Sequence, residues 1–148
     1  MKRRIVIADD DLTIRSLVSL RLGLASFDVL SAENGSDALA LIQKSEPVAV
    51  ILDVKMPGGG LETLDAIKAH PVMQNLPVMM LSGERDPDTV MGAMGAGASD
   101  YMVKPFHPDK LLERVHRLVK SSAMVWTRTA TLAAPVLAAA PAEPVWEL

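Results

Sequence analysis

The sequence contains no cysteine, so disulfide bonds, thiolate metal sites and cysteine nucleophiles are excluded. Aromatic residues make up only 3% of the 148 residues, so a hydrophobic core has to be built from aliphatic side chains and methionine. Basic residues do not dominate either, because the formal net charge is −3 at pH 7. This balance disfavours a dedicated nucleic-acid surface, since phosphate contacts need clustered lysine and arginine.

Long apolar runs are also missing. Only the short run Ile5–Ala8 separates the basic start of the chain from Asp9, which is too little for the hydrophobic region of a signal peptide. No stretch approaches the roughly 18 apolar residues that a membrane span needs. We therefore expect a cytoplasmic protein that does not insert into a membrane.

The sequence does contain a regular alternation of short apolar runs and segments with helical periodicity. Five runs predict buried strands: Ile5–Ala8, Phe27–Ala32, Val48–Leu52, Val78–Leu81 and Tyr101–Val103. Helices are expected after each of them: Leu12–Ala25, a segment between Ser36 and Pro47, Leu61–Ala69, a segment that starts at Pro87, and Pro108–Lys120. Because the strands are continuously apolar, we expect an α/β fold with a parallel sheet that is covered on both faces.

The composition changes near residue 122. Residues 1–121 are expected to form one domain, whereas residues 122–148 are rich in alanine and proline and lack a sustained helical period. We interpret the second part as a flexible extension. Trp126 and Trp146 are unexpected in a purely solvated tail, and either could dock on the domain or on a partner.

Polar side chains gather where the predicted strands end. Asp9, Asp10 and Asp11 follow the first strand, and Asp53 ends the third. The remaining members of the set are Ser82 after the fourth strand and Lys104 after the fifth. The carboxyl ends of parallel strands share one edge of the sheet, which is where α/β proteins bind ligands. These side chains are therefore expected to meet.

The chemistry of this set favours phosphoryl transfer with a divalent cation. Clustered carboxylates repel one another unless a cation lies among them, and oxygen ligands without histidine or cysteine select Mg²⁺. An aspartate can then act as a nucleophile toward phosphorus. Lys104 and Ser82 can help to neutralise the phosphoryl oxygens.

Four segments carry a resemblance to a known family. They are IVIADDDLTIR (Ile5–Arg15), VILDVKMP (Val50–Pro57), PVMMLSG (Pro77–Gly83) and AGASDYMVKPF (Ala96–Phe106). In this order and spacing they resemble the response-regulator receiver domains of two-component signalling, over about Lys2 to Lys120. The resemblance implies a flavodoxin-like, doubly wound (βα)5 fold with a five-stranded parallel sheet.

The resemblance also implies a role for each matching residue at the site. Asp53 is expected to be the phosphoacceptor and a Mg²⁺ ligand. Asp10 is expected to bind Mg²⁺ directly, Asp9 mainly through a water molecule, and Lys55 through its backbone carbonyl.

Other matching positions are expected to transmit or tune the signal. Ser82 and Tyr101 take the places of the switch hydroxyl and the switch aromatic residue. Lys104 matches the phosphoryl-binding lysine, and its bond to Pro105 is expected to be cis. The side chains of Lys55 and Glu84 occupy the two positions that are thought to tune dephosphorylation.

The implied function is a phosphorelay receiver rather than an enzyme, with no activity beyond self-catalysed phosphotransfer and autodephosphorylation. A sensor histidine kinase or a histidine phosphotransferase would donate the phosphoryl group. The face made by the fourth helix, fifth strand and fifth helix would then bind a downstream protein or a second copy of the chain, without direct contact to nucleic acid.

One segment departs from the family pattern, and two other functions stay open. Residues 57–61 form a loop that is one residue shorter than usual, and its three glycines predict a loose conformation. A phosphohydrolase with an aspartyl nucleophile is the main alternative, although such enzymes usually carry Asp-x-Asp after the first strand. An FMN-binding protein of the flavodoxin type is disfavoured, because Asp9–Asp11 would repel the phosphate.

Overall fold

Strands and helices alternate along the whole described part of the protein, which in this computed structural model comprises residues 2–126. The elements are β1 (Arg3–Ala8), α1 (Leu12–Leu24), β2 (Phe27–Ala32), α2 (Gly35–Ser45), β3 (Ala49–Asp53), α3 (Gly60–Ala69), β4 (Val78–Ser82), α4 (Pro87–Gly95), β5 (Asp100–Val103) and α5 (Pro108–Ser121). Every expected strand and helix forms, with ends that differ from the prediction by one or two residues. Trp146 and most of the alanine- and proline-rich extension lie outside the described residues.

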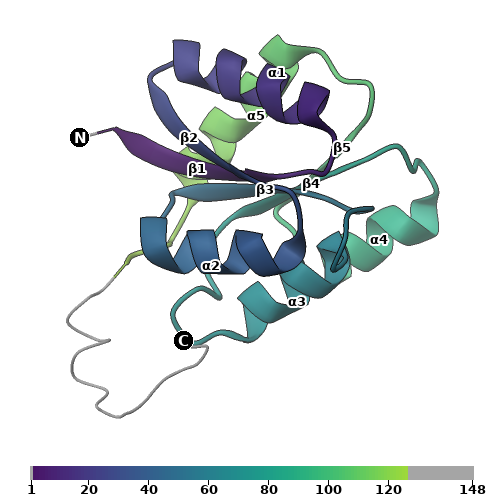
Figure 1. Ribbon diagram of the computed structural model, residues 1–148. Coiled ribbons are helices and arrows are strands. Elements are labelled where there is room, and N and C mark those ends of the chain that lie inside the picture. The colour runs from purple at the N-terminus through teal and green to yellow at the C-terminus, as the bar shows by residue number, and fades with distance from the viewer. Residues whose placement is uncertain (1, 127–148) are drawn as a thin grey trace.

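The five strands form one parallel sheet in the order β2-β1-β3-β4-β5. Helices α1 and α5 cover one face of the sheet, and α2, α3 and α4 cover the other (Figure 1). This is the flavodoxin-like, doubly wound architecture that the sequence predicts. Within residues 2–126, no helix has both the length and the apolar character that a membrane span requires.

The unbroken apolar strands are explained by two cores, one on each face of the sheet. Val6 and Ala8 pack into the core under α2, α3 and α4, whereas Ile5 and Ile7 pack into the core under α1 and α5. Successive side chains of a strand point to opposite faces, so a strand that is covered on both sides needs apolar residues at every position.

The glycine-rich loop before α3 is ordered, contrary to the loose conformation expected from its composition. Gly58 and Gly59 adopt φ values of 85° and 77°, which residues with a side chain rarely adopt. Two backbone hydrogen bonds hold the loop, from Gly59 N to Met56 O at 2.8 Å and from Gly60 N to Val54 O at 3.0 Å. The glycines therefore permit a tight turn that brings α3 close to the end of β3.

We predict opposite effects of alanine at two glycines. A Cβ atom at Gly60 would overlap the backbone of Asp53 and Val54, whereas a Cβ atom at Gly92 in α4 would meet no atom within 4 Å. Gly60→Ala should therefore lower the free energy of unfolding by about 1–3 kcal/mol. Gly92→Ala should raise it by up to about 1 kcal/mol, because alanine favours a helix. Urea unfolding measures both, and a Gly60→Ala variant as stable as the parent would contradict this close approach.

Candidate functional site

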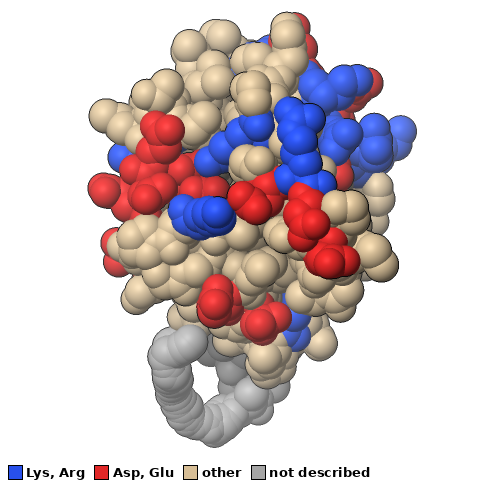
Figure 2. All heavy atoms as spheres, turned by 90° about the vertical axis from the view of Figure 1, so that its right-hand side faces the viewer, with Lys and Arg blue, Asp and Glu red and all other residues tan. Residues whose placement is uncertain are grey.

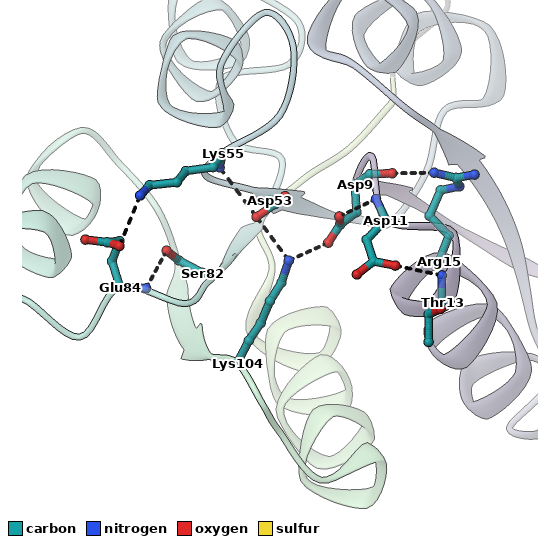
Figure 3. Close-up of polar contacts among 9 residues, drawn as sticks. All are labelled: Asp9, Asp11, Thr13, Arg15, Asp53, Lys55, Ser82, Glu84 and Lys104. Atoms are coloured by element: carbon teal, nitrogen blue, oxygen red, sulfur yellow. Dashed lines mark hydrogen bonds and ion pairs between the residues drawn. The ribbon is translucent and has the colours of Figure 1, made fainter.

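The polar residues that follow the strands do meet at the carboxyl edge of the sheet. Strand β3 lies between β1 and β4, and β4 lies beside β5, so the ends of these four strands are neighbours. Figure 2 looks onto this edge and shows acidic and basic side chains gathered there. Figure 3 shows that Asp9, Asp53 and Lys104 point toward one another from three different strand ends.

Three carboxylates form a tight cluster at this edge. Oxygen atoms of Asp9, Asp10 and Asp53 all lie within 4.8 Å of one another. Asp9 is fully buried and Asp53 is only 5% exposed, whereas Asp10 is open to solvent. The cluster therefore combines two carboxylates that are shielded from water with one that faces the solution.

Lys104 joins the two buried carboxylates. Its Nζ lies 2.8 Å from Oδ2 of Asp9 and 3.2 Å from Oδ1 of Asp53. The backbone N–H of Lys104 donates to the carbonyl of Ser82 at 2.7 Å. This hydrogen bond holds the backbone of Lys104, which follows β5, against the end of β4. As expected, the peptide bond between Lys104 and Pro105 is cis.

Burial and charge shift two pKa values at this site. Burial raises the pKa of Asp53, and the nearby charge of Asp9 raises it further, while Lys104 and the N–H of Lys55 oppose the shift. Burial alone would lower the pKa of Lys104, but its contacts with Asp9 and Asp53 outweigh that effect and raise it. The surroundings of Asp53 thus stabilise its ionised form incompletely.

The donor set fits a hard divalent cation. Three carboxylates face a single ammonium group, which leaves an excess of negative charge in a partly buried site. All the candidate ligands are oxygen atoms, and exposed Asp10 leaves the cluster open to solution on one side. Mg²⁺ prefers such carboxylate oxygens and keeps several water molecules, so the residues present suit this ion.

A second layer of contacts centres on Glu84. The backbone N–H of Glu84 donates to Oγ of Ser82 at 2.9 Å, and Ser82 is only 1% exposed. The hydroxyl of Tyr101 donates to the backbone carbonyl of Glu84 at 3.0 Å. On the surface, Nζ of Lys55 lies 3.1 Å from Oε2 of Glu84. One short segment therefore contacts the candidate switch hydroxyl, the candidate switch aromatic residue and the side chain of Lys55.

Arg15 also supports the site, although the sequence did not single it out. Its Nη1 donates to the backbone carbonyl of Asp9 at 2.7 Å. Asp11 begins α1 by accepting the N–H of Thr13, and its own N–H donates to Asp9 Oδ1 at 2.9 Å. The only signal available in the sequence was the position of Arg15, one helical turn after the cap at Asp11.

Comparison with known proteins identifies the family. The chain matches the response regulator receiver domain over residues 5–116. Among curated proteins, the chain is 31% identical to the phosphate regulon transcriptional regulatory protein PhoB of Pseudomonas aeruginosa over 119 residues. This match covers 80% of this chain and 52% of PhoB. It is 30% identical to the cell cycle transcriptional regulator CtrA of Caulobacter vibrioides over 80% of this chain and 51% of CtrA. The chain thus spans about half the length of these relatives.

Solved structures agree with the sequence match. The chemotaxis response regulator CheY4 of Vibrio cholerae superposes with a TM-score of 0.75 at 33% identity, covering 80% of this chain and 99% of CheY4. A response regulator from Chloroflexus aurantiacus gives a TM-score of 0.77 at 35% identity, and the match covers 81% of this chain and 99% of that one. Because fold, site and sequence match together over most of the described residues, this chain belongs to the response regulator receiver family, the phosphoacceptor switches of two-component signalling.

Proposed function

We propose that Asp53 is the residue of this receiver that accepts the phosphoryl group. The observation that carries this assignment is the pairing of the Asp53 carboxylate with Lys104 at 3.2 Å, inside a carboxylate cluster that suits Mg²⁺. A buried aspartate that is incompletely neutralised and lies beside a cation is a good nucleophile for phosphorus. Asp9 is less suitable, because it is fully buried and accepts the N–H of Asp11 as well as bonding to Lys104.

The proposed step is transfer from a phosphohistidine. A carboxylate oxygen of Asp53 attacks the phosphorus, the phosphorus–nitrogen bond breaks, and the imidazole of the donor leaves. Asp10, Asp53 and the carbonyl of Lys55 would hold Mg²⁺ directly and Asp9 mainly through water, and the ion would supply positive charge to the phosphoryl oxygens. Lys104, which follows β5 at the same edge of the sheet, supplies further positive charge. The donor would be a sensor histidine kinase or a histidine phosphotransferase.

The proposed switch runs through Glu84. The hydroxyl of Ser82 accepts the N–H of Glu84, and a phosphoryl group on Asp53 would offer that hydroxyl a charged acceptor. Movement of Ser82 would disturb the segment whose carbonyl holds Tyr101. The phosphoryl group would in this way favour a second state of the face formed by α4, β5 and α5, where a downstream protein or a second copy binds.

The side chains of Lys55 and Glu84 are proposed to tune how long the phosphoryl group lasts. Their ion pair is exposed on both sides, so its contribution to stability is small, about 0–1 kcal/mol. Its position between the ends of β3 and β4 places it beside the carboxylate cluster (Figure 3). It would therefore affect access of water to the phosphoryl group more than it affects the fold.

The comparisons give no support to the alternative of a phosphohydrolase. We propose that the chain acts in the cytoplasm as a switch, with no turnover beyond its own phosphorylation and dephosphorylation. Two relatives are named as transcriptional regulators, and the chain spans only about half of each. Binding to protein rather than nucleic acid is therefore proposed for this receiver part alone.

Intact mass tests whether Asp53 is the phosphoacceptor. With Mg²⁺ and acetyl phosphate, the parent protein should gain one phosphoryl group in intact mass, and Asp53→Ala should gain none. Asp65→Asn is a matched control, because Asp65 is an exposed carboxylate on α3, away from the strand ends. An equal mass gain in Asp53→Ala, or none in the parent and the control, would overturn the assignment.

The buried carboxylate of Asp53 should make the stability of the protein depend on pH. The pKa of Asp53 is raised in the folded protein, so ionisation of this carboxyl lowers the free energy of unfolding. The loss of stability begins as the pH rises above about 4, the pKa in the unfolded chain, and is complete once the pH exceeds the raised pKa. Without Mg²⁺, Asp53→Asn should therefore be more stable than the parent at neutral pH by on the order of 1 kcal/mol. Lys104 keeps its partner Asp9 in this variant.

Added Mg²⁺ should reduce the difference in stability between Asp53→Asn and the parent, because the ion should bind and stabilise the folded parent more than the variant. Thermal unfolding with and without Mg²⁺ measures the effect, with Asp65→Asn again as the control. Asp10→Asn should also weaken the stabilisation by Mg²⁺. If Mg²⁺ stabilised the parent and both variants equally, the cation site would not be at this cluster.

A variant at Lys104 separates phosphoryl transfer from switching. Lys104→Ala should still accept phosphate from acetyl phosphate, but more slowly, since part of the positive charge at the phosphoryl oxygens is lost. It should fail to reach the second state of the α4–β5–α5 face. Amide chemical shifts of β5 and α5, recorded before and after phosphorylation, test this. Shift changes as large as those of the phosphorylated parent would refute the role of Lys104 in the switch.

A further inference from the structure

The chain keeps packing on the domain after α5 ends at Ser121. The described residues beyond it, 122–126, form what we call the strap. Burial alternates along the strap: the partly buried residues are Ser122, Met124 and Trp126, and the exposed ones are Ala123 and Val125, with Val125 67% exposed. Alternate burial is typical of extended chain that lies on a surface.

Trp126 fixes the far end of the strap. Its indole Nε1 donates to the carbonyl of Pro47 at 2.7 Å, and its ring packs against the core under α2, α3 and α4. A tryptophan that buries its ring and satisfies its N–H makes a specific contact rather than a random one. Of the two docking possibilities left open for Trp126, the structure shows docking on the domain.

The point to which Trp126 binds is itself held firmly. Pro47 lies between α2 and β3, and Arg4 of β1 contacts this connection on both sides of it. The carbonyl of Arg4 accepts the N–H of Val48 at 2.8 Å, and Nη1 of Arg4 donates to the carbonyl of Ser45 at 3.0 Å. Trp126 therefore binds a connection whose backbone is hydrogen-bonded to β1.

The strap leads from one face of the sheet to the other. The buried residues of α5 belong to the core that this helix shares with α1, whereas Met124 and Trp126 pack against the opposite core. Between the two, the chain passes the amino ends of the strands (Figure 1). These ends lie opposite the edge that carries Asp53.

We propose that the strap is a built-in anchor that fixes where the extension leaves the domain. With Trp126 in place, the chain that follows starts beside Pro47, at the amino edge. The strap therefore keeps the C-terminal end of the described chain away from the carboxyl edge that carries Asp53. The proposal rests on the contacts of the strap and does not depend on the role of Asp53.

Tryptophan fluorescence tests the anchor in the full chain. Trp146→Phe leaves Trp126 as the only tryptophan. Acrylamide should quench Trp126 in the folded variant with a constant about half or less of that for the same variant unfolded in guanidinium. Adding Met124→Ser should raise the constant toward the unfolded value, whereas adding the matched outward change Val125→Ser should leave it unchanged. Equal quenching of folded and unfolded Trp146→Phe would overturn the proposal.

Limited proteolysis gives a second, independent measurement. Lys120 lies in the last turn of α5, where the strap should suppress local opening. Trypsin should cut after Lys120 about tenfold faster in Trp126→Ala than in the parent, with Val125→Ala at the parent rate. Circular dichroism would check that each variant is folded, and Asp53→Ala should be cut after Lys120 at the parent rate. Equal cleavage in folded Trp126→Ala and the parent would show that Trp126 anchors nothing.

Discussion

One ammonium group shared between two buried carboxylates is the interaction on which the rest of the site depends. Lys104 reaches Asp9 and Asp53 from a third strand end, and it neutralises only part of their charge. Removing the ammonium group would leave two buried carboxylates without compensation, which usually destabilises a protein strongly. The same excess of negative charge suits a divalent cation, which would in turn supply positive charge to the phosphoryl group in the proposed transfer to Asp53. Stability and reactivity therefore come from one arrangement of charges.

In the proposed switch, the contacts around Glu84 would link the carboxylate cluster to the face formed by α4, β5 and α5. Ser82 and Tyr101 are both buried, and each forms a hydrogen bond with the backbone of Glu84, one with its N–H and the other with its carbonyl. Glu84 is therefore the residue through which a displacement of Ser82 would be passed to Tyr101 in the proposed switch. A segment with two such contacts has few alternative conformations, which favours two discrete states over a gradual change.

The sequence predicted the fold because each strand had to be apolar at every position, and it predicted the site because parallel strands place their carboxyl ends together. Contacts that depend on tertiary packing were not predictable in this way. The hydrogen bond from Arg15 to Asp9 depends on the angle at which α1 leaves the sheet. The loop before α3 is held by backbone hydrogen bonds, which cannot be predicted from its glycine content. For Trp126, the sequence left docking on the domain and docking on a partner open, because the core surface that its ring contacts is formed only by tertiary packing.

The position of the strap has a consequence for how this receiver can be joined to other proteins. β1 begins at Arg3, and the strap ends beside Pro47, next to the hydrogen bond between Val48 and Arg4. Both ends of the described chain therefore lie at the same side of the sheet. Domains with neighbouring ends tolerate circular permutation and insertion into a host loop. Residues 2–126 could be inserted as a module into another protein. The carboxyl edge of the sheet would then face away from the junction and stay accessible to the proposed phosphoryl donor.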